Sequence, residues 1–374
     1  MNRVNDDSIV DLMFNLTWKS DYASHTDCYQ ASNVNIWRDH FPPALLENIM
    51  DKYSGDRIEL SIKQGDILPK VESQKIFKIK SGQFSTNLDP SSFHKPCAGR
   101  FYPKGILQGI ANVFKENIEP FRLVSLDNGH MDVDFNHPLA GKDLKLTTMI
   151  GHVENKDVER GGTSIDWMET LTAGPGMQSR WQNKQTDYFC DDAFFREDAT
   201  PDSEFYLKPR FTQHIDDTAI EMIRNTYDRF LEDDMCVLDL MSSWQSHLPH
   251  RTRLAEFVGV GLNENELRMN PQLQDFSVHD LNENLTLPFK SNHFDAVVNT
   301  VSIEYLIYPL EIFSEIARVL KPDGYFVVTF SNRWFPNKAI KVWKEIHEFE
   351  RMGLVLEYFI RSGSFKDLHT YSIR

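Results

Sequence analysis

Residues 236–248 carry the side chains of this chain that are best placed to bind a ligand. They read CVLDLMSSWQSHL, so a short apolar run containing Asp239 passes directly into the polar pair Ser242 and Ser243. An apolar run of this length, bounded by turn formers, is typical of a buried strand in a parallel sheet. Ligands of open α/β sheets bind at the carboxyl ends of such strands. We therefore expect the junction from Asp239 to Ser243 to line a binding site.

The elements around this junction alternate between strand and helix signals. Apolar runs that predict strands occur at residues 236–241, 257–260, 294–298, 325–330 and 354–360, and helical patterns occur at 264–270, 310–320 and 336–352. Strands separated by helices of this length form parallel βαβ units. The C-terminal half is therefore predicted to contain a doubly wound, mostly parallel sheet.

Several motifs of this half resemble those of class I S-adenosylmethionine-dependent methyltransferases. The motifs are LPF from residue 287, FDAVVN from 294 and EIARVLKPDGYFVV from 315. DLMSSWQSHLP from residue 239 and FSNRWFP from 330 resemble a narrower branch of the same family. The resemblance covers residues 205–374 and implies a Rossmann-like domain with a seven-stranded sheet and S-adenosyl-L-methionine as cofactor.

The resemblance also implies which residues bind the cofactor. The methionine end would be lined by Asp239, Leu240, Met241, Ser242 and Ser243. The usual enzymes have Gly-x-Gly in this loop, because a backbone without Cβ can approach the ligand closely, whereas this loop has no glycine. Gly261 stands where an acid usually accepts the ribose hydroxyls, and Asn263 could still bond them without the strength of a charge.

Three further cofactor residues follow from the same resemblance. Asp280 matches the residue that usually contacts the adenine amino group, with the Leu281 amide beside it, and Asn299 would face the sulfonium. An alternative is a fold that has lost its cofactor, since two of the loops depart from the usual pattern.

The methyl acceptor does not follow from these motifs. Methyl transfer from a sulfonium is an in-line displacement in which positioning supplies much of the catalysis, and a base is needed only for some acceptors. His214, Tyr305 and Arg333 are candidates on the acceptor side, and Arg333 suits an anionic substrate. Core packing is an equally good reading of the tyrosine.

A second group of polar residues lies N-terminal to the strand at residues 236–241. Lys208, Arg210, His214 and Asp216 precede an amphipathic helix for which Asp216 is a suitable N-cap. These residues either close over a ligand or form a solvated loop. Residues 154–204 are irregular but rich in large apolar groups, so we expect a packed connector rather than a free linker.

The N-terminal half, residues 1–153, shows no βαβ rhythm and predicts a small α+β domain with mostly antiparallel strands. VDFNHPLAGKDL from residue 133 and LLENIMDKYSGDRIEL from residue 45 resemble the SlyD-like branch of the FKBP-type peptidyl-prolyl isomerases. The resemblance implies that residues 68–121 are the insert that binds unfolded chains. Leu68 and Leu146 replace the Tyr and Phe usual in the isomerase pocket, so we expect weak or no isomerase activity.

Composition limits the remaining possibilities. The 374 residues suggest two domains of roughly 150 residues or more, and a formal net charge of -15 argues against a general nucleic-acid binder. No apolar run approaches the roughly 20 residues that span a bilayer, and the first residues lack signal-peptide features. Cys28, Cys97, Cys190 and Cys236 lack metal-ligand spacing, so we expect incidental thiols and no metal site.

Two functions from different classes remain open. The first is a cytoplasmic methyltransferase with an FKBP-like accessory domain, whose acceptor is a small molecule or a protein. The second is a prolyl isomerase or chaperone in which the methyltransferase-like half is a non-catalytic scaffold. In either case the FKBP-like half could bind polypeptides or support a homodimer.

Overall fold

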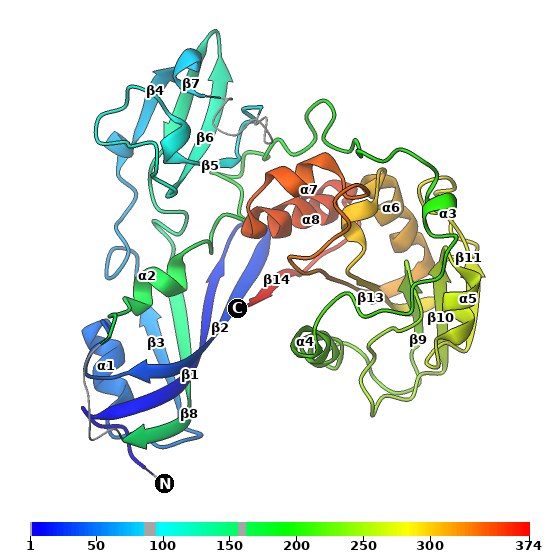
Figure 1. Ribbon diagram of the computed structural model, residues 1–374, viewed down its shortest axis with the longest axis horizontal. Helices are drawn as coiled ribbons and strands as arrows, with labels where there is room; N and C mark the ends of the chain where they lie inside the picture. Colours follow the sequence, from blue (N-terminus) through cyan, green and yellow to red (C-terminus); the bar gives the residue numbers. More distant parts are fainter. Residues whose placement is uncertain (1, 86–94, 156–161) are drawn as a thin grey trace. The chain divides into compact units, whose positions relative to one another are not determined.

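The computed structural model describes residues 2–85, 95–155 and 162–374 (Figure 1). The chain forms two compact units. The first comprises residues 1–188, 346–357 and 366–374, and the second comprises 189–345 and 358–365. These units do not follow the domain boundaries predicted after residues 153 and 204. Much of the predicted connector and residues 346–357 and 366–374 belong to the first unit. Residues 156–161 of the predicted connector lie outside the described residues.

The first unit is built on a five-stranded sheet in the order β14-β2-β1-β8-β3. Its strands are β1 (Ser8–Lys19), β2 (Ala23–Asn35), β3 (Arg57–Ile62), β8 (Leu144–Asn155) and β14 (Leu368–Ile373), and its helices are α1 (Pro43–Ile49) and α2 (Trp167–Thr172). Neighbouring strands are antiparallel except β14, which runs parallel to β2. Alternate residues of β1 are buried, as expected for a strand with one face on a core. The prediction of a mostly antiparallel domain is confirmed.

A second sheet is inserted between β3 and β8 of this unit. It has the order β4-β7-β6-β5 and consists of β4 (Ile76–Lys80), β5 (Phe101–Pro103), β6 (Pro120–Asp127) and β7 (His130–Asp134). It has its own apolar core, in which Phe121, Leu123 and Val133 are fully buried. The sequence predicted an insert at residues 68–121, of which residues 86–94 lie outside the described part of the chain.

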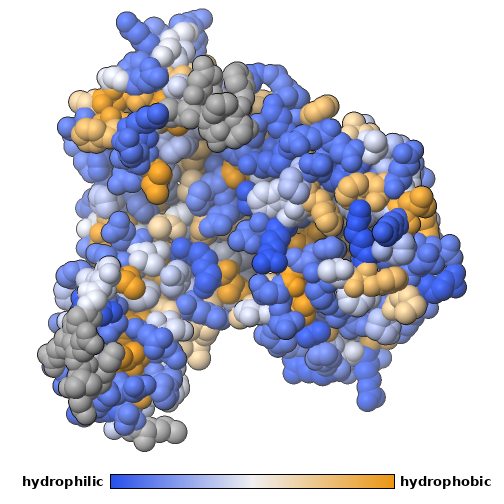
Figure 2. All heavy atoms as spheres, viewed as in Figure 1, coloured by the Kyte–Doolittle hydropathy of each residue, from blue (hydrophilic) through white to orange (hydrophobic). Residues whose placement is uncertain are grey.

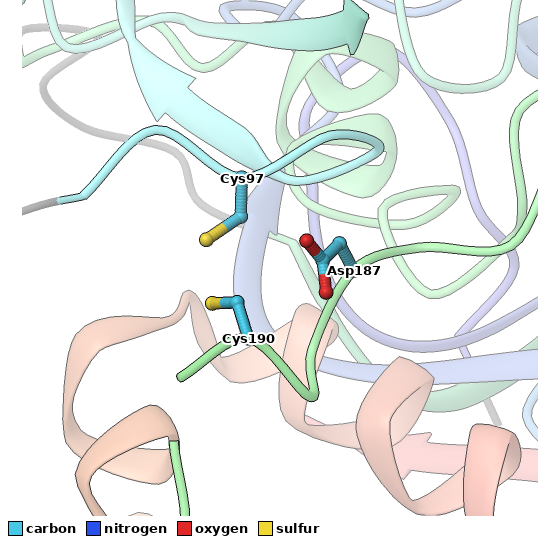
Figure 3. Close-up of side chains that lie close together, drawn as sticks. All are labelled: Cys97, Asp187 and Cys190. Carbon is cyan, nitrogen blue, oxygen red and sulfur yellow. The ribbon is translucent and has the colours of Figure 1, made fainter. Parts of the chain in front are cut away.

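Cys97 and Asp187 of the first unit occupy two neighbouring segments (Figure 3). The Asp187 backbone N–H donates to the Ala98 carbonyl over 2.8 Å, and the Cys97 N–H donates to the Tyr102 hydroxyl over 2.8 Å. Cys190, drawn in the same figure, belongs to the second unit. None of the four cysteines forms a disulfide within the described part of the chain.

The second unit contains a parallel sheet in the order β11-β10-β9-β12-β13. Its strands are β9 (Cys236–Leu240), β10 (Glu256–Gly261), β11 (Asp275–Val278), β12 (Phe294–Thr300) and β13 (Leu320–Thr329). Chain order therefore reverses between β9 and β12, which is the switch point where ligands of such sheets bind. The helices are α3 (Asp202–Phe205), α4 (Asp217–Tyr227), α5 (Glu264–Met269), α6 (Pro309–Val319), α7 (Lys341–Glu345) and part of α8 (Glu348–Ser362).

The expected seven-stranded sheet is wrong, since five strands form it in the described chain. Residues 354–360 were predicted as a strand but belong to α8. A short apolar run cannot be assigned by periodicity alone, and here Leu354 and Tyr358 are both fully buried one helical turn apart. The last strand, β14, pairs with β2 of the first unit instead of extending the parallel sheet.

The surface agrees with the charged composition. The face in Figure 2 is mainly hydrophilic, with hydrophobic residues in small groups. No helix among the described residues is both long enough and apolar enough to cross a membrane.

Candidate functional site

A cavity of about 260 Å³ opens at the carboxyl ends of the strands of the parallel sheet. Most of the predicted cofactor residues line it, namely Asp239, Met241, Ser242, Ser243, Gly261, Asn263, Asp280 and Leu281. The acceptor-side candidates His214, Tyr305 and Arg333 line it as well. Leu240 and Asn299 do not, and both side chains are fully buried behind the wall. The strand junction chosen from the sequence is therefore at the cavity.

The loop after β9 is held by hydrogen bonds from its own serines. The Ser242 hydroxyl donates to Asp239 Oδ2 over 2.6 Å, and the Ser242 N–H donates to the Val260 carbonyl over 2.7 Å. Burial raises the pKa of Asp239 to about 6, against the opposing hydrogen bonds from Ser242 and Ser246. Met241 has a φ of 59°, a left-handed conformation that glycine adopts more readily. The loop thus keeps a glycine-like turn without a glycine.

Close backbone approach occurs at β10 instead of in this loop. A Cβ on Gly261 would lie 2.2 Å from the Ser242 carbonyl oxygen, so any side chain there would displace the loop. A Cβ on Gly259 would lie 2.5 Å from Leu273 Cδ1 and 3.2 Å from Ser242 Oγ. Gly261 is therefore required for the contact between β10 and the β9 loop, and it contributes backbone alone to the cavity.

Asn263 is the N-cap of α5, and its hydrogen-bonding groups are already in use. Its Oδ1 accepts from the N–H groups of Asn265 and Glu266 over 3.0 and 3.1 Å. Its Nδ2 donates to the Tyr206 and Leu207 carbonyls over 2.7 and 3.1 Å. The side chain therefore fixes the preceding segment to α5, and it has no donor left for a ribose.

Glu266 is a cavity residue that the sequence analysis missed. Its Oε2 accepts from the Ser243 hydroxyl and its Oε1 accepts from the Arg210 N–H, each over 2.6 Å. The side chain is buried and lines the cavity. The signal was the spacing of Asn263 and Glu266, since an N-cap residue followed three positions later by Glu is typical of a helix start. This carboxylate supplies the negative charge that the end of β10 lacks.

One carboxylate oxygen of Asp280 accepts no hydrogen bond from any described residue. Its Oδ1 accepts from the Asn282 N–H over 2.9 Å, whereas its Oδ2 is buried without a hydrogen-bond partner. A buried acceptor without a donor costs free energy, so a ligand that donates to it would be stabilised. Asn299 also has a buried oxygen without a partner, Oδ1, but its Nδ2 donates to the Leu240 carbonyl and the Ser302 hydroxyl over 3.0 and 2.9 Å. It joins the ends of β9 and β12 and does not face the cavity.

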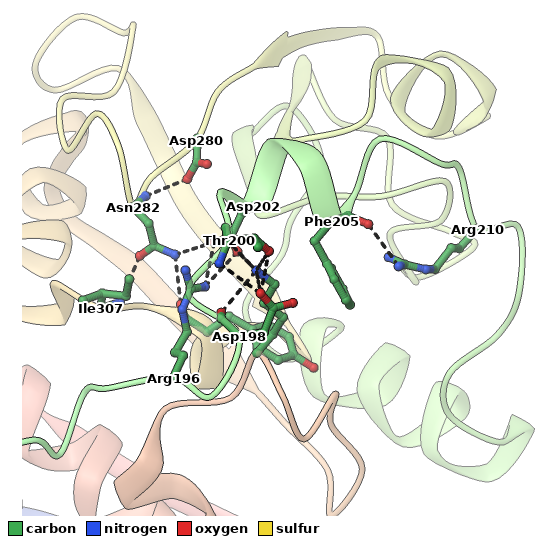
Figure 4. A network of polar contacts seen from close by, with 11 residues as sticks. Arg196, Asp198, Thr200, Asp202, Phe205, Arg210, Asp280, Asn282 and Ile307 are labelled. Atoms are coloured by element: carbon green, nitrogen blue, oxygen red, sulfur yellow. Dashed lines mark hydrogen bonds and ion pairs between the residues drawn. The ribbon is translucent and has the colours of Figure 1, made fainter.

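A buried ionic network supports one side of the cavity (Figure 4). Arg196 Nη1 donates to both oxygens of Asp202 over 2.8 Å, and Lys338 Nζ lies 3.3 Å from Asp202 Oδ1. Asn282 Nδ2 donates to Asp202 Oδ2 over 2.9 Å and to the Tyr305 carbonyl over 3.0 Å. The network joins the loops after β11, β12 and β13 to α3, and the sequence analysis assigned no role to Arg196, Asp202, Asn282 or Lys338.

The acceptor-side candidates have different protonation behaviour. Burial, and then the positive charge of Arg210, lowers the pKa of His214, so its imidazole is neutral near pH 7. Burial raises the pKa of Tyr305, which therefore remains a phenol, and its hydroxyl accepts from the Phe335 N–H over 2.9 Å. Neutral His214 can accept a proton, whereas Tyr305 keeps its proton and can donate a hydrogen bond.

The polar group before α4 is divided by the structure. Arg210 and His214 line the cavity, whereas Lys208 and Asp216 do not. Asp216 caps α4, because its side chain accepts from the Ala219 N–H over 2.9 Å, as predicted. Only Arg210 and His214 are therefore placed where they could contact a ligand.

Part of this unit is similar to known proteins. Residues 242–328 match the family model described as a methyltransferase domain. The biotin biosynthesis bifunctional protein BioHC of Teredinibacter turnerae (strain ATCC 39867 / T7901) is 28% identical over 71 residues, which are 19% of this chain and 12% of that protein.

Similar solved structures also match only part of each chain. The S-adenosylmethionine-dependent methyltransferase from Mesorhizobium loti is 18% identical, with a TM-score of 0.25 and coverage of 30% of this chain and 53% of that one. The geranyl diphosphate C-methyltransferase from Streptomyces coelicolor A3(2) is 21% identical, with a TM-score of 0.24 and coverage of 30% and 45%. The chain thus spans about half of these solved chains and an eighth of the curated relative.

Proposed function

The second unit contains a methyltransferase domain with a Rossmann-like sheet, and from this premise we propose that the chain transfers a methyl group from S-adenosyl-L-methionine to an acceptor in the same cavity. The observation that carries the proposal is the position of the cavity. It lies at the switch point of the sheet and is lined by the residues that the family resemblance assigns to the cofactor.

The residues present fit S-adenosylmethionine in several respects. The partnerless Oδ2 of Asp280 suits the amino group of adenine, which is a hydrogen-bond donor. The carboxylate of Glu266, next to Ser243, provides acceptors for ribose hydroxyls in place of the acid missing at Gly261. Asp239 and the Ser242 and Ser243 loop would border the methionine portion.

The bound cofactor would supply an electrophilic methyl group on its sulfonium. The chain itself would position the acceptor and manage its proton. His214 is neutral near pH 7, so it can accept a proton from a hydroxyl or an ammonium group of the acceptor. Tyr305 keeps its proton and can donate a hydrogen bond that orients the acceptor.

We expect calorimetric titration of S-adenosylmethionine and S-adenosylhomocysteine into the full-length protein to show saturable one-site binding. Asp280→Asn keeps an acceptor for the Asn282 N–H but puts a donor in place of the free acceptor Oδ2. The substitution should lower the affinity for both ligands by about tenfold or more, because a hydrogen bond to a charged group is lost. The decrease in affinity is the measured quantity.

Asp275→Asn is the matched control, since Asp275 is exposed and absent from the cavity lining. Unchanged affinity in a folded Asp280→Asn protein would remove the adenine assignment. Absence of binding by the unmodified protein would contradict the proposed activity as a whole.

For the first unit we propose an FKBP-like accessory role rather than isomerase catalysis. An inserted four-stranded sheet between β3 and β8 supports the likeness. Leu146 is fully buried in the main core of the unit, and Leu68 packs against that core. Aliphatic side chains at these two positions offer neither the hydroxyl nor the ring expected of the pocket.

Proline-limited refolding of a reporter protein tests this role. We expect no acceleration by substoichiometric full-length protein, alongside a strong acceleration by an ordinary prolyl isomerase run in parallel. Acceleration that grows with the amount of this chain would instead favour the isomerase or chaperone alternative.

A further inference from the structure

Arg210 carries a positive charge in the cavity wall that no described carboxylate neutralises. Its guanidinium carbon lies 4.4 Å from the ring centroid of Phe205, 5.3 Å from that of Tyr206 and 5.4 Å from that of Phe335. Nη2 donates to the Phe205 carbonyl over 3.1 Å, whereas Nη1 is buried and has no acceptor. Aromatic faces hold this cation in place, but they do not balance its charge.

Arg333 adds a second guanidinium at the same cavity. The side chain is exposed, lines the cavity and forms no ion pair within the described part of the chain. Its loop is fixed, because the Arg333 N–H donates to the Ser331 hydroxyl over 3.1 Å and the Phe335 N–H donates to the Tyr305 hydroxyl over 2.9 Å. Neither arginine forms an ion pair with a described residue, although the chain has 55 acidic residues and 40 basic ones.

Three of the four carboxylates that line the cavity already have hydrogen-bond or ion-pair partners. Asp202 is paired with Arg196 and Lys338. Asp239 accepts from Ser242. Glu266 accepts from the Ser243 hydroxyl and from a backbone N–H, as described above. Asp280 follows β11, where the adenine is assigned. The positive charge near Phe335 is therefore available to a ligand.

Aromatic rings line the same part of the cavity. The rings of Tyr305 and Phe335 lie 6.1 Å apart with 31° between their planes, and those of Tyr206 and Phe335 lie 6.5 Å apart. The His214 ring meets Phe335 edge to face at 5.1 Å. A flat apolar body gains contact area against such walls. The cavity volume of about 260 Å³ is slightly below the range of about 300–1,000 Å³ that is usual for small-ligand sites.

From these observations we propose that the methyl acceptor is a small molecule with a flat apolar body and an anionic group, which Arg333 and Arg210 select. This inference rests on the proposed function, because it assigns the acceptor of the same site. The anionic group is a carboxylate or a phosphate, since both match the planar guanidinium fork.

Benzoate and its uncharged analogue benzamide test the charge requirement. Each is titrated into the full-length protein saturated with S-adenosylhomocysteine, at low ionic strength, and phenyl phosphate is titrated to compare the two anion types. We expect benzoate or phenyl phosphate to bind at least about tenfold more tightly than benzamide, as expected for charge-assisted hydrogen bonds.

Arg333→Gln should remove most of this preference while leaving the affinity for S-adenosylhomocysteine unchanged. Lys208→Gln is the matched control, because it removes one charge from an exposed side chain outside the cavity and should leave the preference intact. Arg210→Gln, checked for folding by its melting curve, should reduce the preference as well.

Equal affinity for acid and amide overturns the proposal, as does failure of all three probes to bind. A preference that survives both arginine substitutions also overturns it. The titrations are repeated on the ligand-free protein, so the two proposals fail separately. If the protein does not bind S-adenosylhomocysteine, the proposed function is contradicted. If it binds S-adenosylhomocysteine but does not prefer the acids to benzamide, only the proposed acceptor class is contradicted.

Discussion

Removal of residues 366–374 is expected to destabilise the first unit severely, although these residues end the chain. β14 pairs with β2 from Leu368 beside Ala23 to Ile373 beside Cys28, and it covers one edge of the sheet. Arg374 Nη2 donates to Asp27 Oδ2 over 2.7 Å, and the Asp27 side chain is fully buried. Losing the partner of a buried charge alone costs about 3–5 kcal/mol.

Amide hydrogen exchange measures this effect strand by strand. The truncated protein should lose protection in β2, and its melting temperature should fall. Arg374→Gln should reproduce part of the loss, because it removes the charge partner of Asp27 but keeps the strand. Lys19→Gln serves as the control, since it removes an exposed cation at the end of β1. Unchanged protection of β2 in the truncated protein would show that β14 does not support this sheet.

Asp202→Asn is expected to have the largest effect of a single substitution in the second unit. Asp202, Arg196 and Lys338 are all buried, and Lys338 is fully so. Without the carboxylate charge, Arg196 and Lys338 lose a buried anionic partner, although Lys338 still lies 3.5 Å from Asp198 Oδ1, and the expected loss of stability is about 3–5 kcal/mol. Chemical denaturation followed by circular dichroism gives this free energy of unfolding.

Two further variants separate the buried network from ordinary charge effects. Asp192→Asn removes an exposed carboxylate that contacts Lys341 at 2.6 Å, and such surface pairs contribute at most about 1 kcal/mol. Adding Lys338→Met to Asp202→Asn removes one of the buried cations and should recover part of the loss. A loss in Asp202→Asn no larger than in Asp192→Asn would contradict the role assigned to the network.

Features that depend only on neighbouring residues could be predicted from the sequence. The run around Asp239 specifies a buried strand by its own apolarity, and the small polar residues after it specify the end of that strand. Asp216 caps α4 through a bond to a backbone group three residues away, so its role needs no distant partner. The family resemblance assigned both Asp280 and Ser243 to the cofactor site, and both line the same cavity.

Roles that depend on distant partners could not be read in this way. Asn263 appeared free to bind a ribose, but Tyr206 and Leu207 use its amide, while Glu266 enters the cavity through contacts with Ser243 and Arg210. In the buried network, Asp202 contacts Lys338, which lies 136 positions further along the chain.

The sequence alone therefore determined the strand and helix rhythm, the family resemblance and the position of the cavity, because these depend on local periodicity and on short motifs. Only the tertiary structure decided that residues 354–360 are helical and that β14 completes the sheet of the first unit. It also decided which polar side chains remain available to a ligand. An apolar run suits either kind of element, and a polar group is free or engaged according to the segments that fold against it.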